Sequence, residues 1–344
     1  MDTVLITGGC GYIGSHTCVS LIENKYNILI IDSHINSFEN SFDNIKKVVE
    51  NKGFKYNEQI QYIKGDIRNK VWLDEIFNDF NKSQKPIKFV IHFAGLKSIY
   101  SSIKFPLEYW ESNILSTLSL LAVMKKYKCF SLIFSSSATV YKPQGSKLLK
   151  ETDELSPSTP YGKTKLCIEE LLKDLYESNK EWRIANLRYF NPVGSHTSGL
   201  LEENPKGKES NLFPAILRVI RGDKKKLLVY GKDWPTHDGT CIRDFIHVMD
   251  LAEAHIATLE FLIKNKPQYI SINIGTGKGN SVLKVIETFQ EIEGIDFAYE
   301  FVGRRLGDQP VVIAENKLAL KLLKWKPRRT LFDMCSDSVN KKNI

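Results

Sequence analysis

The sequence is poor in cysteine, and its cysteines lack the spacing that metal sites and disulfide frameworks use. Six cysteines are spread over 344 residues, and no two of them form a paired ligand motif. We therefore expect neither a metal site nor a disulfide-stapled fold. Cys18 and Cys167 fall in expected helices, as small buried apolar side chains do, and the lack of pairing favours a reducing compartment.

Long hydrophobic runs are also missing. The longest one, 118–124, is far short of the roughly 20 residues that span a bilayer. The first expected strand begins within four residues of Met1, which leaves no room for a signal or transit segment. We therefore expect a cytoplasmic protein without a membrane partner.

Positive charge is present but is not concentrated. Lys and Arg number 48 against 40 Asp and Glu, a net charge of +8, and the densest runs, 224–226 and 324–329, are short. This pattern is typical of a solvated basic face that attracts a phosphorylated substrate, so we expect no nucleic-acid partner. The length suits one large domain or two modest ones, and there are no internal repeats.

Strands and helices alternate in the first half of the chain. Strands are expected at 3–7, 27–32, 60–64, 87–93, 130–136 and 183–188, and helices at about 12–24, 42–52, 69–80, 107–127 and 161–178. Such alternation predicts an α/β fold with a doubly wound, Rossmann-like parallel sheet. In sheets of this kind the ligand lies at the carboxyl ends of the strands.

The texture of the sequence changes after residue 190. A loop rich in Gly, Pro and Ser over 191–207 predicts the start of a smaller C-terminal α/β substrate lobe, 191–344, after a cofactor domain of 1–190. The lobe should hold a helix near 211–222, a strand at 227–230 and a helix at 281–293. A helix at 248–264 and a strand at 269–274 should pack back on the first domain, which roughly 241–275 would complete. The glycine-rich run 275–280 is expected to be a turn without a ligand.

A glycine loop follows the first strand. Glycines at 8, 11 and 14 lead directly into the first helix, so backbone N–H groups at the helix start can approach a pyrophosphate. Asp32 ends the second strand, where a carboxylate meets the ribose hydroxyls of a dinucleotide and repels a 2′-phosphate. NAD is therefore favoured over NADP. A plain tight turn is the alternative interpretation of the glycines.

Polar or small residues also follow the next strands. Asp66 comes after the third strand, Ala94 and Gly95 after the fourth, and a serine cluster at 135–137 after the fifth. Asp66 could accept a hydrogen bond from an adenine amino group. Each of these could be a simple turn or helix cap, but together they point to one rim of the sheet.

Tyr161 and Lys165 lie four residues apart at the start of a helix that begins at Pro160. A free phenol has a pKa near ~10, and lowering that pKa by ~3 units, to neutral pH, takes roughly 4 kcal/mol. A neighbouring ammonium, the helix N-terminus and a nicotinamide cation would all favour the phenolate. Ser137 would bond the reacting hydroxyl and share its proton with Tyr161. The alternative is an exposed surface pair.

These motifs resemble the extended short-chain dehydrogenase/reductase family, and within it the UDP-glucose 4-epimerases. The likeness includes TGGCGYIGSH, HFAGLK at 92–97, SSSATVY at 135–141, YGKTK at 161–165, RYFNPVG at 188–194, DGTCIRDFIHVMDLA at 238–252 and RRLGDQP at 304–310. It implies that UDP-glucose and UDP-galactose are interconverted by transient oxidation of sugar carbon 4 by bound NAD. It also implies a homodimer through the helices at 107–127 and 161–178.

The resemblance assigns further roles residue by residue. Tyr161, Lys165 and Ser137 would be catalytic. Cofactor contacts would come from Gly8, Gly11, Tyr12, Ile13, Gly14, Asp32, Ser33, Asn36, Ser37, Asp66, Ile67, Phe93, Ala94, Gly95, Lys97, Asn113, Tyr161, Lys165 and Tyr189. The UDP-sugar would be held by Ser137, Asn191, Asn211, Leu212, Tyr230, Arg243, Arg305 and Asp308. Arginines suit a diphosphate because their forked donors bind it bidentately, although Arg243 could instead pair with neighbouring Asp244.

Some positions depart from the family pattern. Lys142 stands where a glycine is usual, Ser33 replaces a frequent asparagine, and Val312 stands where some members have a tyrosine that narrows the sugar pocket. We therefore expect N-acetylated UDP-sugars to be accepted as well. A 4,6-dehydratase or decarboxylase would need a carboxyl group at the places of Ala138 and Thr139. A non-catalytic NAD-binding protein would have no need of the Tyr/Lys pair.

Overall fold

The computed structural model describes residues 2–54, 59–145, 148–206 and 211–339. Its central sheet has seven strands in the order β11-β6-β5-β4-β1-β2-β3, and every neighbouring pair runs parallel. The strands are β1 (Thr3–Thr7), β2 (Asn27–Asp32), β3 (Ile60–Lys64), β4 (Ile87–His92), β5 (Ser131–Ser137), β6 (Arg183–Tyr189) and β11 (Tyr269–Ile274). Strand order reverses between β1 and β4, the point at which doubly wound sheets bind their ligands.

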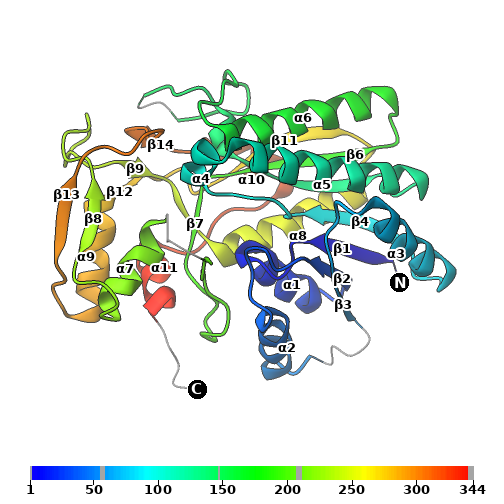
Figure 1. Ribbon diagram of the computed structural model, residues 1–344, viewed down its shortest axis with the longest axis horizontal. Coiled ribbons are helices and arrows are strands. Elements are labelled where there is room, and N and C mark those ends of the chain that lie inside the picture. Colours follow the sequence, from blue (N-terminus) through cyan, green and yellow to red (C-terminus); the bar gives the residue numbers. More distant parts are fainter. Residues whose placement is uncertain (1, 55–58, 146–147, 207–210, 340–344) are drawn as a thin grey trace.

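Helices cover both faces of this sheet (Figure 1). One face carries α1 (Tyr12–Glu23), α2 (Ser41–Asn51), α8 (Val248–Lys264) and α10 (Lys317–Leu323), and the other carries α3 (Lys70–Lys82), α5 (Pro106–Lys126) and α6 (Pro160–Ser178). In β1, Val4 and Ile6 belong to the apolar core under α1, α2, α8 and α10, and Leu5 belongs to the core under α3, α5 and α6. Because both faces are buried, the strands read as continuous apolar runs rather than as alternating ones.

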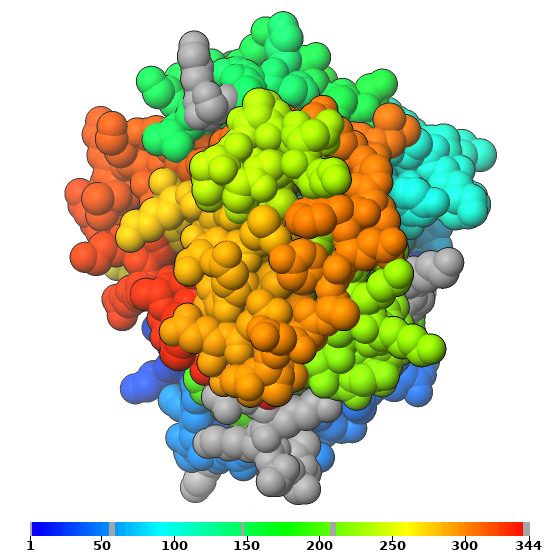
Figure 2. Space-filling model, turned by 90° about the vertical axis from the view of Figure 1, so that its left-hand side faces the viewer, coloured from blue at the N-terminus to red at the C-terminus, as the bar shows by residue number. Residues whose placement is uncertain are grey.

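A second lobe stands beside the carboxyl ends of the strands, at the left of Figure 1. Its helices α7 (Leu212–Ile220), α9 (Val282–Glu293) and α11 (Leu331–Val339) enclose a separate apolar core with β8 (Leu227–Tyr230), which pairs with β13 (Tyr299–Val302). Smaller sheets join β7 (Asn191–Val193) to β10 (Phe245–His247), and β9 (Ile242–Arg243) to β12 (Asn280–Ser281) and β14 (Val311–Val312). Seen end-on, the gold and orange segments of α9 and β13 form much of its surface (Figure 2).

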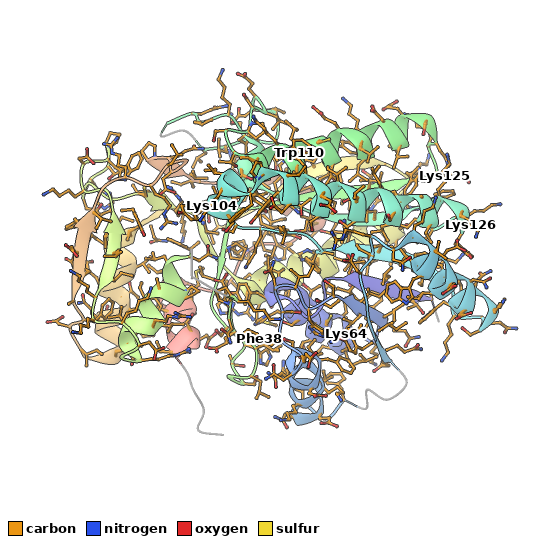
Figure 3. All side chains as sticks on the ribbon, viewed as in Figure 1. Phe38, Lys64, Lys104, Trp110, Lys125 and Lys126 are labelled. Atoms are coloured by element: carbon orange, nitrogen blue, oxygen red, sulfur yellow. The ribbon has the colours of Figure 1, made fainter. Side chains whose placement is uncertain are left out.

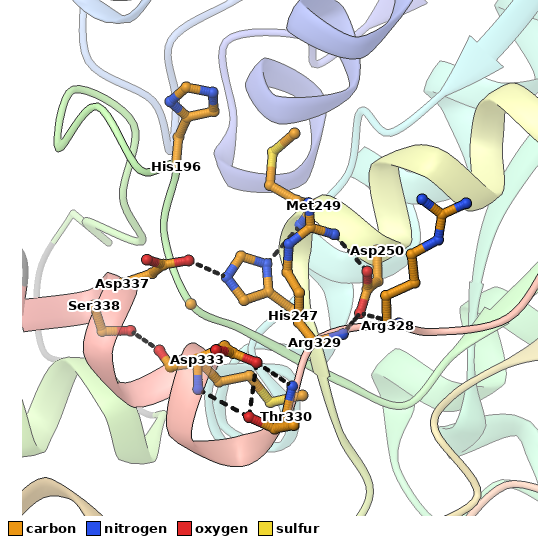
Figure 4. A network of polar contacts seen from close by, with 12 residues as sticks. His196, His247, Met249, Asp250, Arg328, Arg329, Thr330, Asp333, Asp337 and Ser338 are labelled. Atoms are coloured by element: carbon orange, nitrogen blue, oxygen red, sulfur yellow. Dashed lines mark hydrogen bonds and ion pairs between the residues drawn. The ribbon is translucent and has the colours of Figure 1, made fainter.

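Polar contacts tie α11 to the start of α8 (Figure 4). His247 accepts from the Met249 amide at Nδ1, so its Nε2 carries the proton that Asp337 accepts at 3.1 Å. Asp250 accepts from the backbone amides of Arg328 and Arg329 and pairs with the Arg329 guanidinium. Since α8 packs on a face of the sheet and α11 belongs to the second lobe, this network anchors the lobe to the sheet domain.

The sheet and its main helices confirm the predicted α/β fold. The strand at 269–274 indeed returns to the sheet, where it pairs with β6. The loop expected from 191 begins instead with β7. The strand expected at 227–230 is β8, but α4 (Ile99–Lys104), α10, α11 and the other short strands of the second lobe were not foreseen. The domain boundaries at 190 and 241–275 stay predictions. Among the described residues, no helix is long and apolar enough to cross a membrane.

Candidate active site

A cleft of about 1900 Å³ lies between the carboxyl rim of the sheet and the second lobe. Pockets for single small ligands run to roughly 300–1,000 Å³, so this one has room for two ligands side by side. Its walls include the ends of β1, β2, β4, β5 and β6 on one side, and parts of α7, β8, β9 and the segment 305–309 on the other. All of the predicted site residues line this cleft except Asn113.

Neither Gly8, in the loop between β1 and α1, nor Gly14, in the first turn of α1, has space for a side chain. Gly8 has a φ of +71°, and a Cβ there would lie 2.8 Å from the Ala94 nitrogen. A Cβ on Gly14 would lie 2.4 Å from the Gly8 carbonyl oxygen. α1 begins at Tyr12 after Gly11 with no side-chain cap, so no side chain competes for its first amides. The loop is therefore built for close backbone approach to an anion.

Asp32 closes the far end of this wall. Its carboxylate accepts from the amides of Cys10 at 2.9 Å and His34 at 2.8 Å, and from the Ser37 hydroxyl at 2.9 Å. These donors hold a buried negative charge against the cleft. Such a charge accepts from ribose hydroxyls and repels a 2′-phosphate. Ser37, a predicted cofactor contact, orients Asp32 here.

Asp66 lies on the same wall with its partner Arg68, whose guanidinium donates to both carboxylate oxygens. Burial acts to raise the pKa of Asp66, but the hydrogen bonds and charge of Arg68 outweigh it and lower the pKa. Phe38, in the loop after β2, and Lys64, the last residue of β3, are labelled in Figure 3 and mark this wall.

The candidate catalytic groups come from β5 and α6. α6 begins at Pro160, and Thr159 caps it by accepting from the Gly162 amide. Lys165 Nζ donates to the Ser135 carbonyl at 2.7 Å and lies 5.8 Å from the centre of the Tyr161 ring. Ser137 Oγ ends β5 and accepts from the amide and the hydroxyl of Thr139. The three residues therefore face one part of the cleft, and the reading of Tyr161 and Lys165 as a mere surface pair is wrong.

In the chain without its cofactor, burial is the largest influence on the pKa values of Tyr161 and Lys165. Burial raises the pKa of Tyr161 to about 12, against the opposing hydrogen bond to Ser137. Burial lowers the pKa of Lys165 to about 7, against the opposing charge of Glu169. The sequence prediction of an acidic phenol counted the ammonium, the helix terminus and the nicotinamide cation, and it gave no weight to the desolvation of the phenol. Burial thus opposes the phenolate, and the positive charge of a bound nicotinamide, which the prediction included, would favour it.

Tyr189 and Asn113 have supporting positions. His255 Nδ1 donates to the Leu251 carbonyl, so its Nε2 accepts from the Tyr189 hydroxyl at 2.6 Å. Tyr189 lines the cleft, and its hydroxyl is engaged by His255. Asn113 lies behind the loop after β4, where it bonds both the amide and the carbonyl of Leu96. It shapes that loop from outside the cleft, beside Gly95, where a Cβ would lie 2.9 Å from Asn113 Oδ1.

The second wall carries the positive groups. Arg305 lies 4.1 Å over the Tyr230 ring, and Arg243 lies 3.7 Å from Asp308. Arg243 also donates to the Ile242 and Gln309 carbonyls, which aims its guanidinium along the cleft. The alternative pairing of Arg243 with Asp244 is wrong.

Asp244 is buried and faces the other way. Its carboxylate accepts from the amides of Thr276, Gly277 and Ala314. Two of those amides belong to the glycine-rich run 275–280, which therefore holds Asp244 rather than a phosphate.

Glu203 is a cleft residue that sequence reasoning missed. It lies in the segment between β7 and α7, and its Oε1 accepts from Lys97 and Asn211, two predicted ligand contacts. Only its place in the loop after residue 190 hinted at a role. Within the described part of the chain, no group of three or more His, Cys, Asp or Glu residues is arranged to hold a metal ion.

Comparison with known proteins decides the family. The model of the NAD dependent epimerase/dehydratase family matches residues 4–275. This chain belongs to that family. It is 42% identical to UDP-glucose 4-epimerase 2 of Arabidopsis thaliana, over 98% of this chain and 94% of the relative. It is 39% identical to the UDP-glucose 4-epimerase of Bacillus subtilis, over 97% of this chain and 95% of the relative.

The chain is also similar to a longer relative and to a solved structure. The chain is 44% identical to the bifunctional protein gal10 of Schizosaccharomyces pombe, but spans only 46% of its length. The UDP-glucose-4-epimerase of Stenotrophomonas maltophila, solved with bound NAD and formylated UDP-arabinopyranose, superimposes with a TM-score of 0.91 at 42% identity, over 98% of this chain and 97% of that one. The fold and the family thus agree.

Proposed function

We propose that this chain is an NAD-dependent UDP-glucose 4-epimerase that interconverts UDP-galactose and UDP-glucose. The observation that carries the proposal is the placement of Tyr161, Lys165 and Ser137 between a dinucleotide-type wall and an arginine-bearing wall of one cleft. Relatives of that name match nearly the whole chain. The experiment is direct: purified protein is incubated with UDP-galactose and no added NAD. UDP-glucose is the expected product, and its absence from protein shown to contain NAD would overturn the proposal.

The residues present fit NAD. The Gly8 cradle admits no Cβ, and the Asp32 carboxylate is buried and oriented by three donors, as a ribose contact requires. Lys165 would hold the nicotinamide ribose, and Gly11, Tyr12, Ile13 and Gly14 would hold the pyrophosphate. Bound NAD would supply the hydride acceptor for sugar carbon 4 and a positive charge beside the phenol.

The chain's own groups handle the proton. Ser137, held by Thr139, hydrogen-bonds the sugar 4-hydroxyl, and Tyr161 accepts the proton as general base and returns it as general acid. Arg243 and Arg305 bind the diphosphate bidentately, while Asp308 accepts from the uridine ribose. Because these contacts grip the nucleotide, the sugar can turn over between the loss and the return of hydrogen.

The alternative reactions fit the site less well. A 4,6-dehydratase or decarboxylase needs a carboxyl group beside the serine, and the structure puts Ala138 and Thr139 there, with the Thr139 hydroxyl engaged by Ser137. A non-catalytic NAD-binding protein has no use for a desolvated Tyr/Lys pair.

Val312 favours a second class of substrate. It lines the cleft and is half-buried, and valine leaves more room than a tyrosine would. We infer that UDP-GlcNAc and UDP-GalNAc are also interconverted. A solved UDP-Glc/GlcNAc 4-epimerase of Campylobacter jejuni is 31% identical, with a TM-score of 0.80 over 98% of each chain. Protein that converts UDP-glucose but leaves UDP-GlcNAc untouched would contradict this inference.

We also propose a cytoplasmic homodimer. The six cysteines are unpaired, as in a reducing compartment. Leu107, Leu115 and Leu118 on α5 are exposed, and Figure 3 labels Trp110 on the same helix. A two-fold contact through α5 and α6 would cover this apolar face. Light scattering on the protein as it elutes from a gel-filtration column should give twice the mass of one chain. Leu118→Glu should lower this measured mass toward that of one chain. A monomeric wild type would contradict the dimer.

A further inference from the structure

The segment 199–206 crosses from the second lobe to the cofactor wall. Its two ends are attached to the loop and helix that follow β2. Asn44 on α2 donates to the Leu200 carbonyl at 3.1 Å, and Lys206 Nζ donates to the His34 carbonyl at 2.7 Å. In Figure 1 this segment follows β7 and runs beside α1 and α2. Glu203 lies between these two attachments and faces the cleft.

One oxygen of Glu203 joins the two walls of the cleft. Its Oε1 accepts from Lys97 Nζ at 2.9 Å and from Asn211 Nδ2 at 2.7 Å. Lys97 follows β4 on the cofactor side, and Asn211 is the N-cap residue of α7 on the substrate side. Lys97 also lies 5.6 Å from the centre of the Tyr12 ring, at the start of α1. The carboxylate thus contacts one predicted residue for each ligand.

Because Glu203 is buried, its charge depends on the hydrogen bonds from Lys97 and Asn211. Its side chain is only 7% exposed, whereas that of Lys97 is 49% exposed. Its second oxygen, Oε2, is buried and has no hydrogen-bond partner among the described residues. A buried carboxylate with one unsatisfied oxygen depends on the donors that remain. Lys97 and Asn211 therefore cannot move away from Glu203 independently without leaving a buried charge uncompensated.

We propose that Glu203 is a positioning residue of the reaction, which holds Lys97 toward the cofactor and Asn211 toward the nucleotide of the substrate. This inference rests on the proposed function, since that function gives Lys97 and Asn211 their ligands. Glu203 touches neither reacting atom. Its effect is to couple the two walls, so that a protein retaining its cofactor also presents an ordered nucleotide site.

The test uses Glu203→Gln in the full-length protein purified with its own NAD. Glutamine keeps the size but removes the charge and replaces one oxygen by a donor. The expected result is a roughly tenfold weaker affinity for UDP by calorimetry, because hydrogen bonds to charged groups are worth that much or more. KM for UDP-galactose should rise in parallel while kcat changes less than about twofold in NAD-loaded protein. NAD remaining after extended dialysis should fall by at least half.

Glu154→Gln is the matched control. Glu154 pairs with Lys142 at the same 2.9 Å, but it is exposed and lies away from the cleft. It should change none of these quantities. If Glu203→Gln leaves either UDP affinity or NAD retention within twofold of wild type, or lowers kcat with KM unchanged, the proposal is overturned. Should Glu203→Gln fail to fold, Glu203→Asp, which keeps the charge but is too short to reach both donors, is judged by the same two quantities.

A double variant tests the route through Asn211. If Glu203 acts on UDP through Asn211, adding Glu203→Gln to Asn211→Ala should weaken UDP binding less than twofold further. A full additional loss would overturn that route. UDP affinity and NAD retention need no turnover, so a wild type that interconverts no sugar would sink the proposed function while still allowing Glu203 to be judged.

Discussion

The two walls of the cleft hold their functional groups in different ways. On the cofactor wall the contacts come from backbone and from a buried, fully oriented carboxylate: Gly8 and Gly14 lie against main chain, and Asp32 has three donors. On the substrate wall they come from half-buried side chains on short strands or loops: Arg243 pairs with Asp308, and Arg305 lies over the Tyr230 ring. The first arrangement suits a ligand that stays, and the second suits one that exchanges.

The largest effect should come from the group between the walls. Tyr161→Phe removes the proton acceptor and keeps the ring, so turnover should fall by roughly 10²–10⁴-fold. NAD content and UDP affinity should stay within twofold of wild type because the variant changes neither wall. Steady-state rates and calorimetry measure this, and a near-normal rate would mean that the base lies elsewhere.

On the cofactor wall, a steric change alone should weaken NAD binding. Gly14→Ala puts a methyl group 2.4 Å from the Gly8 carbonyl oxygen, so the loop must shift. We expect a more than tenfold loss of retained NAD, measured spectroscopically after gel filtration. Gly303→Ala is the control, because a Cβ there meets nothing within 4 Å. Full NAD retention in Gly14→Ala would contradict the close packing of this wall.

On the substrate wall, the loss of one positive charge should weaken substrate binding. Arg305→Ala removes a guanidinium stacked on Tyr230, and KM for UDP-galactose should rise roughly 10- to 100-fold, the size expected for charge-assisted hydrogen bonds. NAD content should not change. The neighbouring Arg304→Ala is the control, since Arg304 pairs with exposed Asp233 outside the cleft. Equal effects of the two variants would remove the assignment of Arg305.

The comparison also separates what the sequence could and could not reveal. Strands such as β1 and β2 are long apolar runs buried on both faces, so their pattern predicts them locally. β9 and β14 have two residues each and exist because they pair across about 70 residues of chain, which no local pattern records. The role of Glu203 depends on a contact 106 residues away. The burial that raises the pKa of Tyr161 could not be predicted either, because it follows from the packed structure and not from neighbours in sequence.

The last prediction concerns stability in acid, which depends on the core rather than on either wall of the cleft. Burial lowers the pKa of His16 and His92 to about 3, and that of His196 and His255 to about 4. Since their pKa in the unfolded chain is near ~6.5, the stability from neutral burial is complete above that pH. It is lost as the pH falls, by about 1.4 kcal/mol per pH unit for each proton that unfolding takes up.

The unfolding temperature should therefore drop between pH 7 and pH 5. The exposed His237, whose side chain is 69% exposed, supplies the control His237→Gln, which should keep the same drop. An unfolding temperature that stays level over this range would show that these histidines are charged in the folded protein.

The central claim is that hydrogen taken from the sugar is held inside the cleft and returned to the same carbon. The measurement is the fate of deuterium in UDP-galactose labelled at carbon 4 of the sugar, incubated with the purified protein and no added cofactor. We predict UDP-glucose that carries the deuterium at carbon 4, with none released to water. Product that has lost the label to solvent would contradict the account.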